Sequence, residues 1–512
     1  MLRRLNLFYF FLGCIFLTAI YSISIFSTKA EESLKFDLDK ELKKGNLFIG
    51  LKAYLGGKND TFSINKNITF ETYDGFLNLY SSNGIKHKSK QIKILWKDIP
   101  IETPYSHKKL VFGPFASYES AQRESKKLEN LGLSTTIAYP ENWEIWAPLG
   151  ENMPSKEFNY KLSKRIYKSK ITPFLSTEFT LQKLEGPIYI SSDQDIKINN
   201  INFGNNFYLA KDAYGTWTLI QKMSFDDYLA GVLPYEIGPN SPLEALKAQA
   251  VIARTWAIYN SKRFGIDNYH LCITTQCQVY KPPKNQNEKV KKAIKDTSNL
   301  VMSFGNKPIN SFYHGSNGGI SASASESWEM EDYPYFKVLI DGSKSIQKTF
   351  QIPIRHESVL NEFLDTEEKK LYGSNHSLFR WKKRLSNSEI SEYLQKNMSI
   401  GMKVDIVDLK VVERGASGRV TKLELIVNNS RKPIFLVKDD IRRIFSFLPS
   451  NLFTINKLNN NLWQFKGGGF GHGVGLSQSG AIEMAEFGFT YEQILNHYYQ
   501  GAKLRKIEIS SQ

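Results

Sequence analysis

Two kinds of apolar spacing alternate along this chain and predict a mixed fold. Apolar residues at every second position predict strands, whereas apolar residues three and four positions apart predict helices. The strand-like segments are residues 160–225, 402–412 and 419–427, and the last two flank the turn sequence Gly415-Ala-Ser-Gly418. The helical segments are residues 439–447 and 490–498, of which the second opens with the capping pattern Thr490-x-x-Gln493. We therefore expect an α+β fold whose motif loops come from distant segments.

A strongly helical segment follows Ser241. Ser241 fits the N-cap, Pro242 fits the first helical position, and Glu244 three residues after the cap completes a capping box. Lys247 and Arg254 are seven residues apart, about two helical turns, so we expect both to project from one face. The opposite face carries mostly small apolar residues suited to close packing, namely Leu243, Leu246, Ala250, Ala253 and Ala257.

An apolar run near the N-terminus predicts the compartment. Met1-Leu-Arg-Arg is basic, and residues 7–26 form an almost uninterrupted apolar run of about 20 residues. This length fits a signal peptide with a long core or an uncleaved membrane anchor, which we assign to residues 1–30. Because the basic start keeps the N-terminus cytoplasmic, we expect the rest of the chain to be exported to the periplasmic or wall-facing side. No second span is expected.

The charge balance depends on this compartment. The chain has 67 basic and 51 acidic residues, a formal net charge of +16. Such an excess would suggest a nucleic-acid partner for a cytosolic protein. For an exported protein, anionic wall or membrane polymers are the better partners, and we expect no nucleic acid. A diffuse basic composition without any partner explains the excess equally well.

The region between the apolar run and residue 160 has its own pattern. Residues 108–115 are strand-like, residues 117–131 are helical with Gly132 as a stop, and residues 134–139 are strand-like again. This β-α-β pattern resembles a SPOR-type repeat, a module that binds peptide-free glycan. We therefore divide the chain into an N-terminal α/β region (31–160) with a SPOR-like module and a main region (161–512).

Glu236 is the first candidate for catalysis. It lies beside Leu233, Tyr235 and Ile237, in a connection flanked by Pro and Gly that precedes the helix. Apolar neighbours remove water, and desolvation disfavours the charged form of a carboxyl group. Such an acid stays protonated near neutral pH and donates its proton to a leaving oxygen. A solvated loop acid is the alternative, and the spacing does not decide between the two.

The run from Phe225 to Tyr259 resembles the SpoIID/LytB family, the stage II sporulation protein D group of cell-wall proteins. Further segments match in the same order within about residues 185–505, namely Cys277-Gln-Val-Tyr280, Tyr313-His-Gly-Ser-Asn-Gly-Gly319, Ser417-Gly-Arg419 and Gly469-Phe-Gly-His-Gly-Val-Gly-Leu-Ser-Gln478. The resemblance implies that Glu236 is the catalytic acid and that Lys247 and Arg254 line the groove. It also implies substrate contacts from Gln278, Tyr280, His314, Ser316, His472 and Gln478.

Characterised members of this family are lytic transglycosylases that cut glycan strands stripped of peptide, and others are known as amidase enhancers. The resemblance implies a peptidoglycan lytic transglycosylase that cleaves MurNAc-GlcNAc bonds and leaves 1,6-anhydro ends. Ordinary glycosidases place two carboxylates around the bond. Here no second acid has a convincing spacing, and Asp226 and Asp227 fit turn or helix-start positions. The alternative is a non-catalytic wall-binding protein that enhances an N-acetylmuramoyl-L-alanine amidase.

Two of the three cysteines, Cys272 and Cys277, are close together in the sequence. An exported protein meets oxidising conditions, which favours a disulfide. Alternatively, His270 and the two thiolates supply three of the four ligands of a structural zinc site, and His314 is a candidate for the fourth. Relatives that hold zinc through one His and two Cys at this place put zinc ahead of the disulfide. No organic cofactor is expected.

The segment 466–475 is rich in glycine but lacks the spacing of a phosphate-binding or dinucleotide-binding loop. Glycine there lets the backbone approach a sugar closely or adopt positive φ. His472 in this loop, like His314 and Ser316 in the earlier motif, fits either a contact with substrate or a hydrogen-bonded structural role. Both alternatives stay open.

Overall fold

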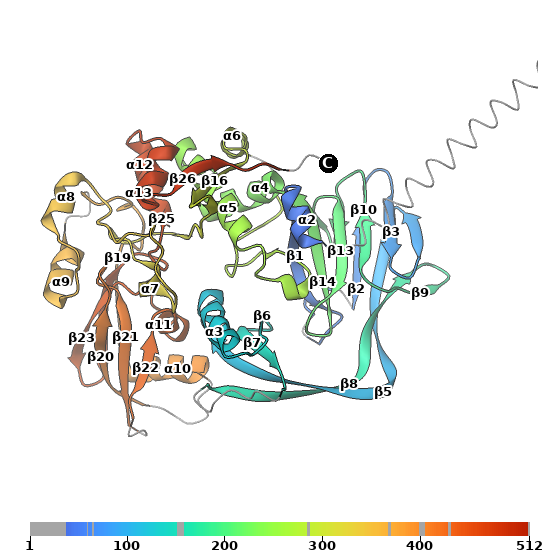
Figure 1. Cartoon of the computed structure of the whole chain (residues 1–512), viewed down its shortest axis with the longest axis horizontal. Coiled ribbons are helices and arrows are strands. Elements are labelled where there is room, and N and C mark those ends of the chain that lie inside the picture. The colour runs from blue at the N-terminus through green and yellow to red at the C-terminus, as the bar shows by residue number, and fades with distance from the viewer. Residues whose placement is uncertain are drawn as a thin grey trace, which may run out of the picture.

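The computed structural model describes residues 37–58, 60–63, 66–150, 158–283, 287–366, 370–398, 405–428 and 432–509. The predicted signal peptide or anchor (1–30, with its apolar run 7–26) lies outside these ranges. Within them, no helix is both long enough and apolar enough to cross a bilayer. Helices and strands are mixed along the described chain (Figure 1), which confirms the predicted α+β class.

The first large sheet has seven strands in the order β15-β1-β14-β13-β10-β3-β4. Neighbouring strands are antiparallel except β15, which runs parallel to β1. The strands are β1 (Asn46–Leu55), β3 (Leu77–Ser81), β4 (Lys86–Ser89), β10 (Ile188–Ser191), β13 (Asn206–Lys211), β14 (Trp217–Ser224) and β15 (Leu271–Cys272). Both β14 and β1 contact the next helix, α4 (Phe225–Glu236), so this sheet supports the candidate acid.

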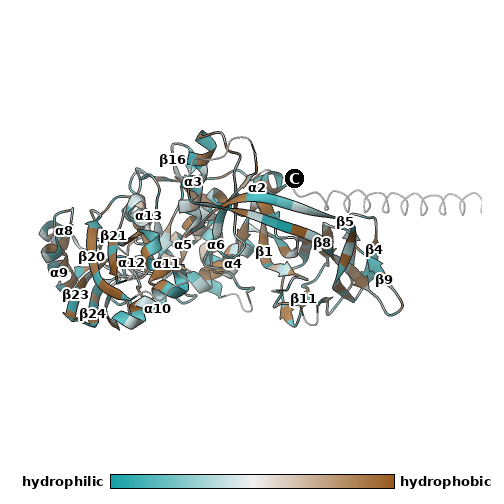
Figure 2. Cartoon of the chain, turned by 90° about the horizontal axis from the view of Figure 1, so that it is seen from below, coloured by the Kyte–Doolittle hydropathy of each residue, from teal (hydrophilic) through white to brown (hydrophobic). Residues whose placement is uncertain are grey.

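The second large sheet has the order β12-β11-β2-β5-β7-β6, with β8 paired to β5 and β9 paired to β8. The strands are β2 (Asn67–Glu71), β5 (Gln91–Phe115), β6 (Thr136–Ala138), β7 (Trp143–Pro148), β8 (Tyr160–Ser176), β9 (Leu181–Lys183), β11 (Lys197–Ile198) and β12 (Ile201–Asn202). The β5–β8 pair is an extended ribbon (Figure 2) with many exposed positions along its middle. The predicted strand content of residues 160–225 is confirmed.

Both sheets join regions that the sequence analysis assigned to different domains. The predicted boundary between residues 160 and 161 falls at the start of β8, whose partner β5 lies on the other side of it. The first strand, β1, pairs with β14 and β15 of the main region. One hydrophobic core includes residues from Leu47 to Ala502. The boundary therefore separates strands of the same sheets.

The predicted β-α-β element near residue 115 is confirmed. Between β5 and β6 lies α3 (Tyr118–Asn130), and its N-cap residue Ser117 accepts a hydrogen bond from Ser120 N (3.2 Å). Asp439 in the C-terminal part accepts hydrogen bonds from Ser117 Oγ (2.6 Å) and Ser120 Oγ (3.0 Å). The element is thus fastened to the C-terminal part, and its SPOR-like glycan binding stays a prediction.

Two helices, α4 and α5 (Leu243–Tyr259), lie in the middle of the molecule (Figure 1). The neighbours of α5 are α4, α6 (Glu288–Asp296), α12 (Gln478–Glu486), α13 (Tyr491–Tyr498) and β16 (Leu300–Phe304). The predicted small-residue stripe is confirmed for Leu246, Ala250, Ala253 and Ala257, which are fully buried. Close packing of these small side chains brings α5 near the end of α4.

The start of α5 differs from the prediction. Pro242 is the N-cap, and no side chain caps the helix. Ser241 Oγ instead donates to the carbonyl of Ile237 (2.7 Å), and the Glu244 carboxylate accepts a hydrogen bond from Tyr491 N (2.9 Å). The predicted capping box of Ser241 and Glu244 is wrong, because tertiary contacts with α4 and α13 satisfy both side chains.

The C-terminal part contains the predicted hairpin. The strands β20 (Ile406–Arg414) and β21 (Val420–Val427) pair antiparallel, and β22 (Ile434–Val437) extends them. The predicted helices are α11 (Asp439–Ile444) and α13, which opens with the Thr490–Gln493 capping box. The remaining elements are β17 (Lys307–Pro308), β18 (Tyr313–His314), α7 (Ala324–Ser327), α8 (Lys344–Thr349), α9 (Glu357–Asp365), β19 (Arg380–Ser386), α10 (Asn387–Met398), β23 (Phe453–Asn459), β24 (Leu462–Gly468), β25 (Leu476–Ser477) and β26 (Lys503–Lys506).

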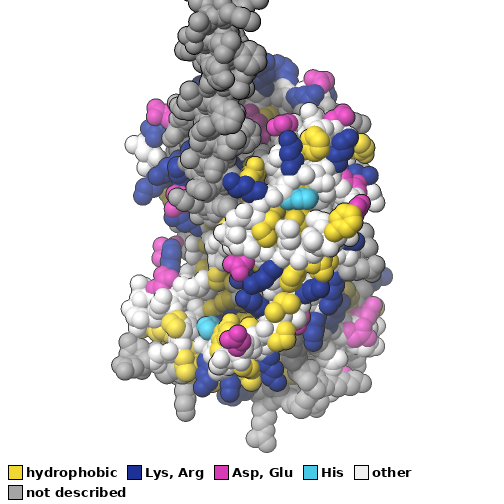
Figure 3. All heavy atoms as spheres, turned by 90° about the vertical axis from the view of Figure 1, so that its right-hand side faces the viewer, with side chains coloured by type: hydrophobic (Ala, Val, Ile, Leu, Met, Phe, Trp, Pro, Cys, Tyr) yellow, Lys and Arg dark blue, Asp and Glu magenta, His cyan; other side chains and the backbone are white. Residues whose placement is uncertain are grey.

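The basic excess is spread over the surface. Figure 3 shows Lys and Arg side chains scattered over the end of the molecule that carries the outer strands of the two large sheets, with acidic side chains between them. Charges of both signs are interspersed on this face. The view agrees with a diffuse basic composition there.

Candidate active site

Glu236 is the last residue of α4 and not part of a loop. The residues Pro234 and Gly238 on either side of it had indicated a connection between elements. The structure keeps Pro234 inside the last turn, and Gly238 follows the helix with φ of 88°. At the other end, Ser224 Oγ caps the helix by accepting a hydrogen bond from Asp227 N (3.1 Å). Because a helix C-terminus carries partial negative charge, the position of Glu236 itself favours the neutral acid.

Three hydrogen bonds from separate segments reach the Glu236 carboxyl group. Val279 N donates to Oε1 at 2.7 Å, and the side chains of Tyr313 and Gln478 also hydrogen-bond to the carboxyl group. Glu236 is half-buried. Burial raises the pKa of Glu236 above its usual value, and the three hydrogen bonds only partly offset this effect. The expected desolvation is confirmed, and the side chain is suited to donate a proton.

A chain of side-chain hydrogen bonds fixes Tyr313. Tyr228 OH donates to Gln278 Oε1 (3.0 Å), and Gln278 Nε2 donates to Tyr313 OH (3.0 Å). Because Gln278 uses the Tyr313 oxygen as an acceptor, the Tyr313 proton is left for Glu236. Burial raises the pKa of Tyr313 well above its usual value, so the phenol keeps this proton.

Tyr280 lies along α4 beside this chain. Its ring stacks on that of Tyr228, with centroids 5.8 Å apart and an interplanar angle of 9°. A Cβ at Gly231 would lie 2.2 Å from the Tyr280 ring. Glycine at this position therefore lets the segment after the disulfide lie against the helix, where Val279 reaches Glu236.

The strand β18 uses both of its faces, because adjacent residues of a strand point in opposite directions. Tyr313 contacts Glu236, whereas His314 Nδ1 lies 3.1 Å from the carbonyl of Val474 in the glycine-rich segment. His314 is therefore part of this second cluster and not of the zinc site considered for it. Its ring centroid is 5.1 Å from that of His472.

The glycine-rich segment is held by these residues. His472 Nε2 lies 2.9 Å from the carbonyl of Tyr313, and the backbone of Ser316 pairs with that of Phe470. Burial lowers the pKa of His472 to about 3 and that of His314 well below its usual value, so both rings are neutral. The contacts of His314, Ser316 and His472 support a structural role, and their contact with substrate stays a prediction.

Lys247 and Arg254 share one face of α5, as predicted, because both reach residues 296–300. Lys247 Nζ lies 2.9 Å from Glu244 Oε1 and 3.3 Å from Asp296 Oδ2. Burial opposes the charge of Lys247, but these two carboxylates raise its pKa above the usual value. Lys247 is thus a paired ammonium group.

Arg254 is buried, with 1% of its surface exposed. Its Nη1 donates to the carbonyls of Thr297 (2.9 Å) and Leu300 (3.1 Å), and Nη2 lies 3.6 Å from Asp226 Oδ1. Burial lowers the pKa of Arg254 to about 10. The guanidinium braces the start of α4 against the connection between α6 and β16. The position of Arg254 therefore favours a role in holding α4 in place over the predicted contact with substrate in the groove.

The zinc prediction is not supported. Cys272 and Cys277 form a disulfide, with Cα atoms 5.7 Å apart. Both ring nitrogens of His270 have partners, since Nδ1 accepts a hydrogen bond from Phe48 N (2.9 Å) and Nε2 lies 3.0 Å from the carbonyl of Leu38. No cluster of three or more potential His, Cys, Asp or Glu ligands is found among the described residues. The structure fits the alternative, a disulfide just before Gln278.

Three side chains of the site were not predicted from the sequence. Tyr313 stood next to His314 in a quoted motif, and the alternation of a strand was the signal that the two residues face different partners. Tyr228 lies within the run from Phe225 to Tyr259 that carries the family resemblance. Gln249 is fully buried in α5, and its Oε1 lies 3.4 Å from Gln478 Nε2. A polar residue within an apolar helical stretch was the signal there.

The part of the chain that forms this site is similar to known proteins. Residues 213–304, which hold α4, α5 and the disulfide, match the family model of stage II sporulation protein. The chain is 28% identical over 301 residues to the amidase enhancer of Bacillus subtilis (strain 168). It is 24% identical over 310 residues to the stage II sporulation protein D of Bacillus amyloliquefaciens. The chain belongs to the SpoIID/LytB family.

Coverage differs among the relatives of this SpoIID/LytB protein. The match with the amidase enhancer covers 54% of this chain and 40% of that protein, less than half of its length. The match with stage II sporulation protein D covers 56% of this chain and 76% of the relative. An uncharacterized protein of Brachyspira hyodysenteriae is 27% identical over 386 residues, or 70% of this chain and 90% of that protein. Residues 322–475 match a domain of unknown function (DUF8618), so in this SpoIID/LytB protein the glycine-rich segment falls within that domain.

Proposed function

We propose that this protein is a peptidoglycan lytic transglycosylase that cleaves MurNAc-GlcNAc bonds in peptide-free glycan strands. Its family membership supports a cell-wall-related role. The observation that carries the finer proposal is the half-buried carboxyl group of Glu236, whose pKa is raised by burial. A proton donor with this property is the one group that the reaction requires from the protein.

The proposed reaction needs a single acid. Glu236 gives its proton to the glycosidic oxygen as the bond from that oxygen to C1 breaks. The carboxylate then accepts the proton of the C6 hydroxyl group while the C6 oxygen bonds to C1, which forms the 1,6-anhydro end. Val279 N, Tyr313 and Gln478 stabilise the carboxylate between the two steps. Glu236 is protonated again at the end, and no water molecule is consumed.

The proposal is tested with purified protein and peptide-free glycan strands. We expect anhydro-ended products by mass spectrometry, and we expect Glu236→Gln to lower their rate at least ~100-fold, the usual range for loss of a general acid. Gln keeps an oxygen for Val279 N but has no proton to give. Unchanged product release by this variant would remove Glu236 from the reaction.

Glu326→Gln is the matched control. Glu326 is also buried, burial also raises the pKa of its carboxyl group, and it accepts a hydrogen bond from Ser417 N (3.1 Å). It lies in α7 and contacts the turn of the C-terminal hairpin, and no hydrogen bond joins it to Glu236 or Tyr313 among the described residues. We expect this variant to keep its activity, so that only loss at Glu236 reports the chemistry.

A second candidate function is enhancement of a wall amidase without catalysis, because one relative is named amidase enhancer. In that case the wild-type protein releases no anhydro products but increases the turnover of an added N-acetylmuramoyl-L-alanine amidase. Glu236→Gln would then enhance the amidase as well as the wild type does. The two functions are distinguished by these two assays on the same preparations.

The location and the delivery of substrate complete the proposal. We place the reaction outside the inner membrane, with residues 7–26 as signal peptide or anchor. The β5-α3-β6 element would bind peptide-free glycan as a SPOR-like module and hold the strand near the acid. Fractionation of cells that produce the full chain tests the first statement, and pull-down with peptide-free glycan tests the second.

A further inference from the structure

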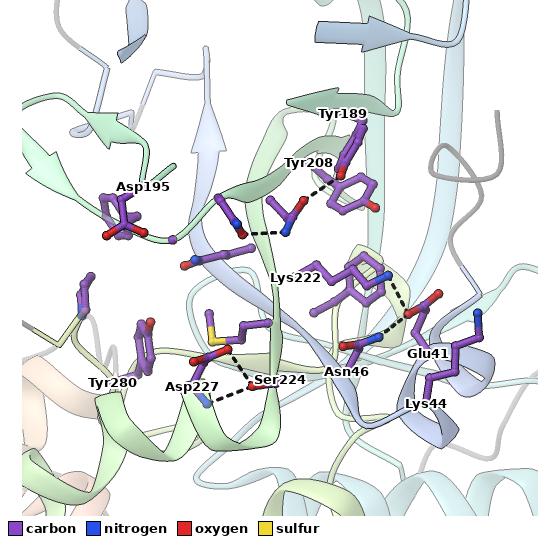
Figure 4. A pocket seen from close by; sticks show the side chains of 18 of the residues that line it. Glu41, Lys44, Asn46, Tyr189, Asp195, Tyr208, Lys222, Ser224, Asp227 and Tyr280 are labelled. Atoms are coloured by element: carbon purple, nitrogen blue, oxygen red, sulfur yellow. Dashed lines mark hydrogen bonds and ion pairs between the residues drawn. The ribbon is translucent and has the colours of Figure 1, made fainter. Parts of the chain in front are cut away.

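A cavity lies at the opposite end of α4 from Glu236. Its volume is about 1020 Å³, and its walls come from α2 (Leu38–Lys43), from the first large sheet and from residues 280–283 (Figure 4). Ser224 and Asp227 at the start of α4 line it, as does Tyr280. Asp227 and Ser224 lie nine and twelve residues before Glu236, so at about 1.5 Å per residue roughly 14–18 Å of helix separate this wall of the cavity from the acid. Tyr280 directly follows Val279, so the same segment contacts Glu236 and lines the cavity.

The lining of this cavity is polar but not cationic. Of the 22 lining residues, sixteen have polar side chains, among them three lysines and four acidic residues. The cavity thus lacks the basic excess of the whole chain, which has a net charge of +16, and does not fit a polyanion. Five lining residues carry amide groups, namely Asn46, Asn202, Asn205, Asn206 and Gln221. Amide groups both donate and accept hydrogen bonds, as a ligand with hydroxyl and acetamido groups requires.

Gln221 in β14 is the strongest indication of a ligand. Only 4% of its surface is exposed, and its Oε1 finds no hydrogen-bond partner among the described residues. A Cβ at Gly204, another lining residue, would lie 2.5 Å from Gln221 Nε2, so glycine makes room for this amide group. A buried oxygen without a donor destabilises the fold. Its position on a cavity wall points to a donor that a ligand supplies.

Side chains around the cavity are held in place by one another (Figure 4). Tyr189 OH donates to Asn206 Oδ1 at 2.7 Å. Across the cavity, Glu41 pairs with Lys222 Nζ (2.7 Å) and accepts a hydrogen bond from Asn46 Nδ2 (2.8 Å). Groups that are already ordered lose little freedom when a ligand binds. The cavity is therefore preorganised for a polar ligand.

We propose that this cavity binds a neutral saccharide with hydroxyl and acetamido groups, as a second glycan site beyond the reacting bond. The choice of a glycan rests on the proposed function, whereas the need for a hydrogen-bond donor at Gln221 does not. Binding there would hold the strand along α4 while Glu236 acts on a bond at the other end of the helix.

The test measures binding of a β-1,4-linked N-acetylglucosamine hexasaccharide to the full chain by calorimetry, with Glu236→Gln as the parent to prevent turnover. Adding Gln221→Leu removes the amide and keeps the volume. We expect about 3- to 10-fold weaker binding, as for one lost hydrogen bond, and an unchanged or higher melting temperature. Affinity within twofold of the parent would overturn the proposal.

Thr218→Val is the matched control. Thr218 lies in the same strand, is 1% exposed, and its Oγ1 has no hydrogen-bond partner among the described residues, but it does not line the cavity. We again expect an unchanged or higher melting temperature, but no loss of affinity. Equal losses in Thr218→Val and Gln221→Leu would show a general effect of the strand and overturn the assignment.

Two further outcomes separate this proposal from its alternatives. If a stem-type peptide ending in D-alanyl-D-alanine binds in a Gln221-dependent way and the hexasaccharide does not, the saccharide assignment is wrong. If the wild type forms no anhydro products but its saccharide binding depends on Gln221, the catalytic proposal fails and this one stands.

Discussion

Replacing Tyr313 by Phe tests how the protein holds Glu236 as an acid. The phenol OH hydrogen-bonds to the Glu236 carboxyl group and lowers its pKa, against the larger effect of burial, which raises it. Phe keeps the ring and removes only the hydroxyl group. Because the carboxylate loses a donor that the neutral acid needs less, the pKa of Glu236 should rise further.

The size of this change follows from the hydrogen bond. A hydrogen bond to a charged group contributes about 1.5–3 kcal/mol, and one pKa unit corresponds to about 1.36 kcal/mol. Glu236 is half-buried and keeps the bonds from Val279 N and Gln478, so the lower end of this range applies. We expect the pKa of Glu236 to rise by about one unit.

The assay is the pH dependence of kcat/KM for release of anhydro products, since its alkaline limb reports the pKa of the essential acid in the free enzyme. In Tyr313→Phe this limb should move to higher pH by about one unit, and a carbon-13 NMR titration of Glu236 should show the same shift. Tyr228→Phe, which acts only through Gln278, should move it less. A limb that stays in place or moves to lower pH would refute the assigned hydrogen bond.

Three further predictions concern stability. Burial raises the pKa of Asp439 to about 7, so the folded state binds more protons than the unfolded state between about pH 4 and 7, and this group lowers stability as the pH rises through that window. In urea unfolding, Asp439→Asn should be more stable than the wild type at pH 8, by at most about 4 kcal/mol. Near pH 4 the two proteins should be equally stable. Equal stability of the two proteins at both pH values would contradict the raised pKa. Reduction of the Cys272–Cys277 disulfide should lower the free energy of unfolding by about 2 kcal/mol for so short a loop. A metal chelator should leave the melting temperature unchanged. A lower melting temperature in the presence of the chelator would restore the zinc prediction. Gly231→Ala should destabilise the fold by about 1–3 kcal/mol in thermal unfolding because a Cβ collides with a tyrosine ring, whereas Gly265→Ala, with open space around it, should not; equal effects would refute the close contact.

The hairpin and the helix cap, which are stabilised by residues close together in the sequence, were predicted correctly. The hairpin around Gly415–Gly418 and the capping box at Thr490 were found because turn glycine and cap residues act over a few positions. Glu236 was found as the candidate acid, but its place was wrong, since Pro234 and Gly238 were taken as signs of a connection between elements. The structure keeps Pro234 in the last turn of α4, which is packed against the first sheet.

The tertiary contacts of a residue were harder to predict than the face of the helix on which it lies. The spacing of Lys247 and Arg254 placed both on one side of α5, but only the fold shows that the α6–β16 connection covers that side and buries Arg254. Val279 serves Glu236 through its backbone N–H, which leaves no trace in the choice of side chain. For Cys272 and Cys277 the residues allowed two bonding patterns, and their distance in the fold supports the disulfide.

The groups that surround the Glu236 carboxyl come from stretches made long after it. Gln478, near the C-terminus, begins α12, which packs on α5. A shortened chain that ends before this point would keep Glu236 and the hydrogen bond from Val279 N but lose the one from Gln478, which stabilises the carboxylate. Loss of the C-terminal segment would therefore alter the surroundings of an acid that lies more than 200 positions upstream.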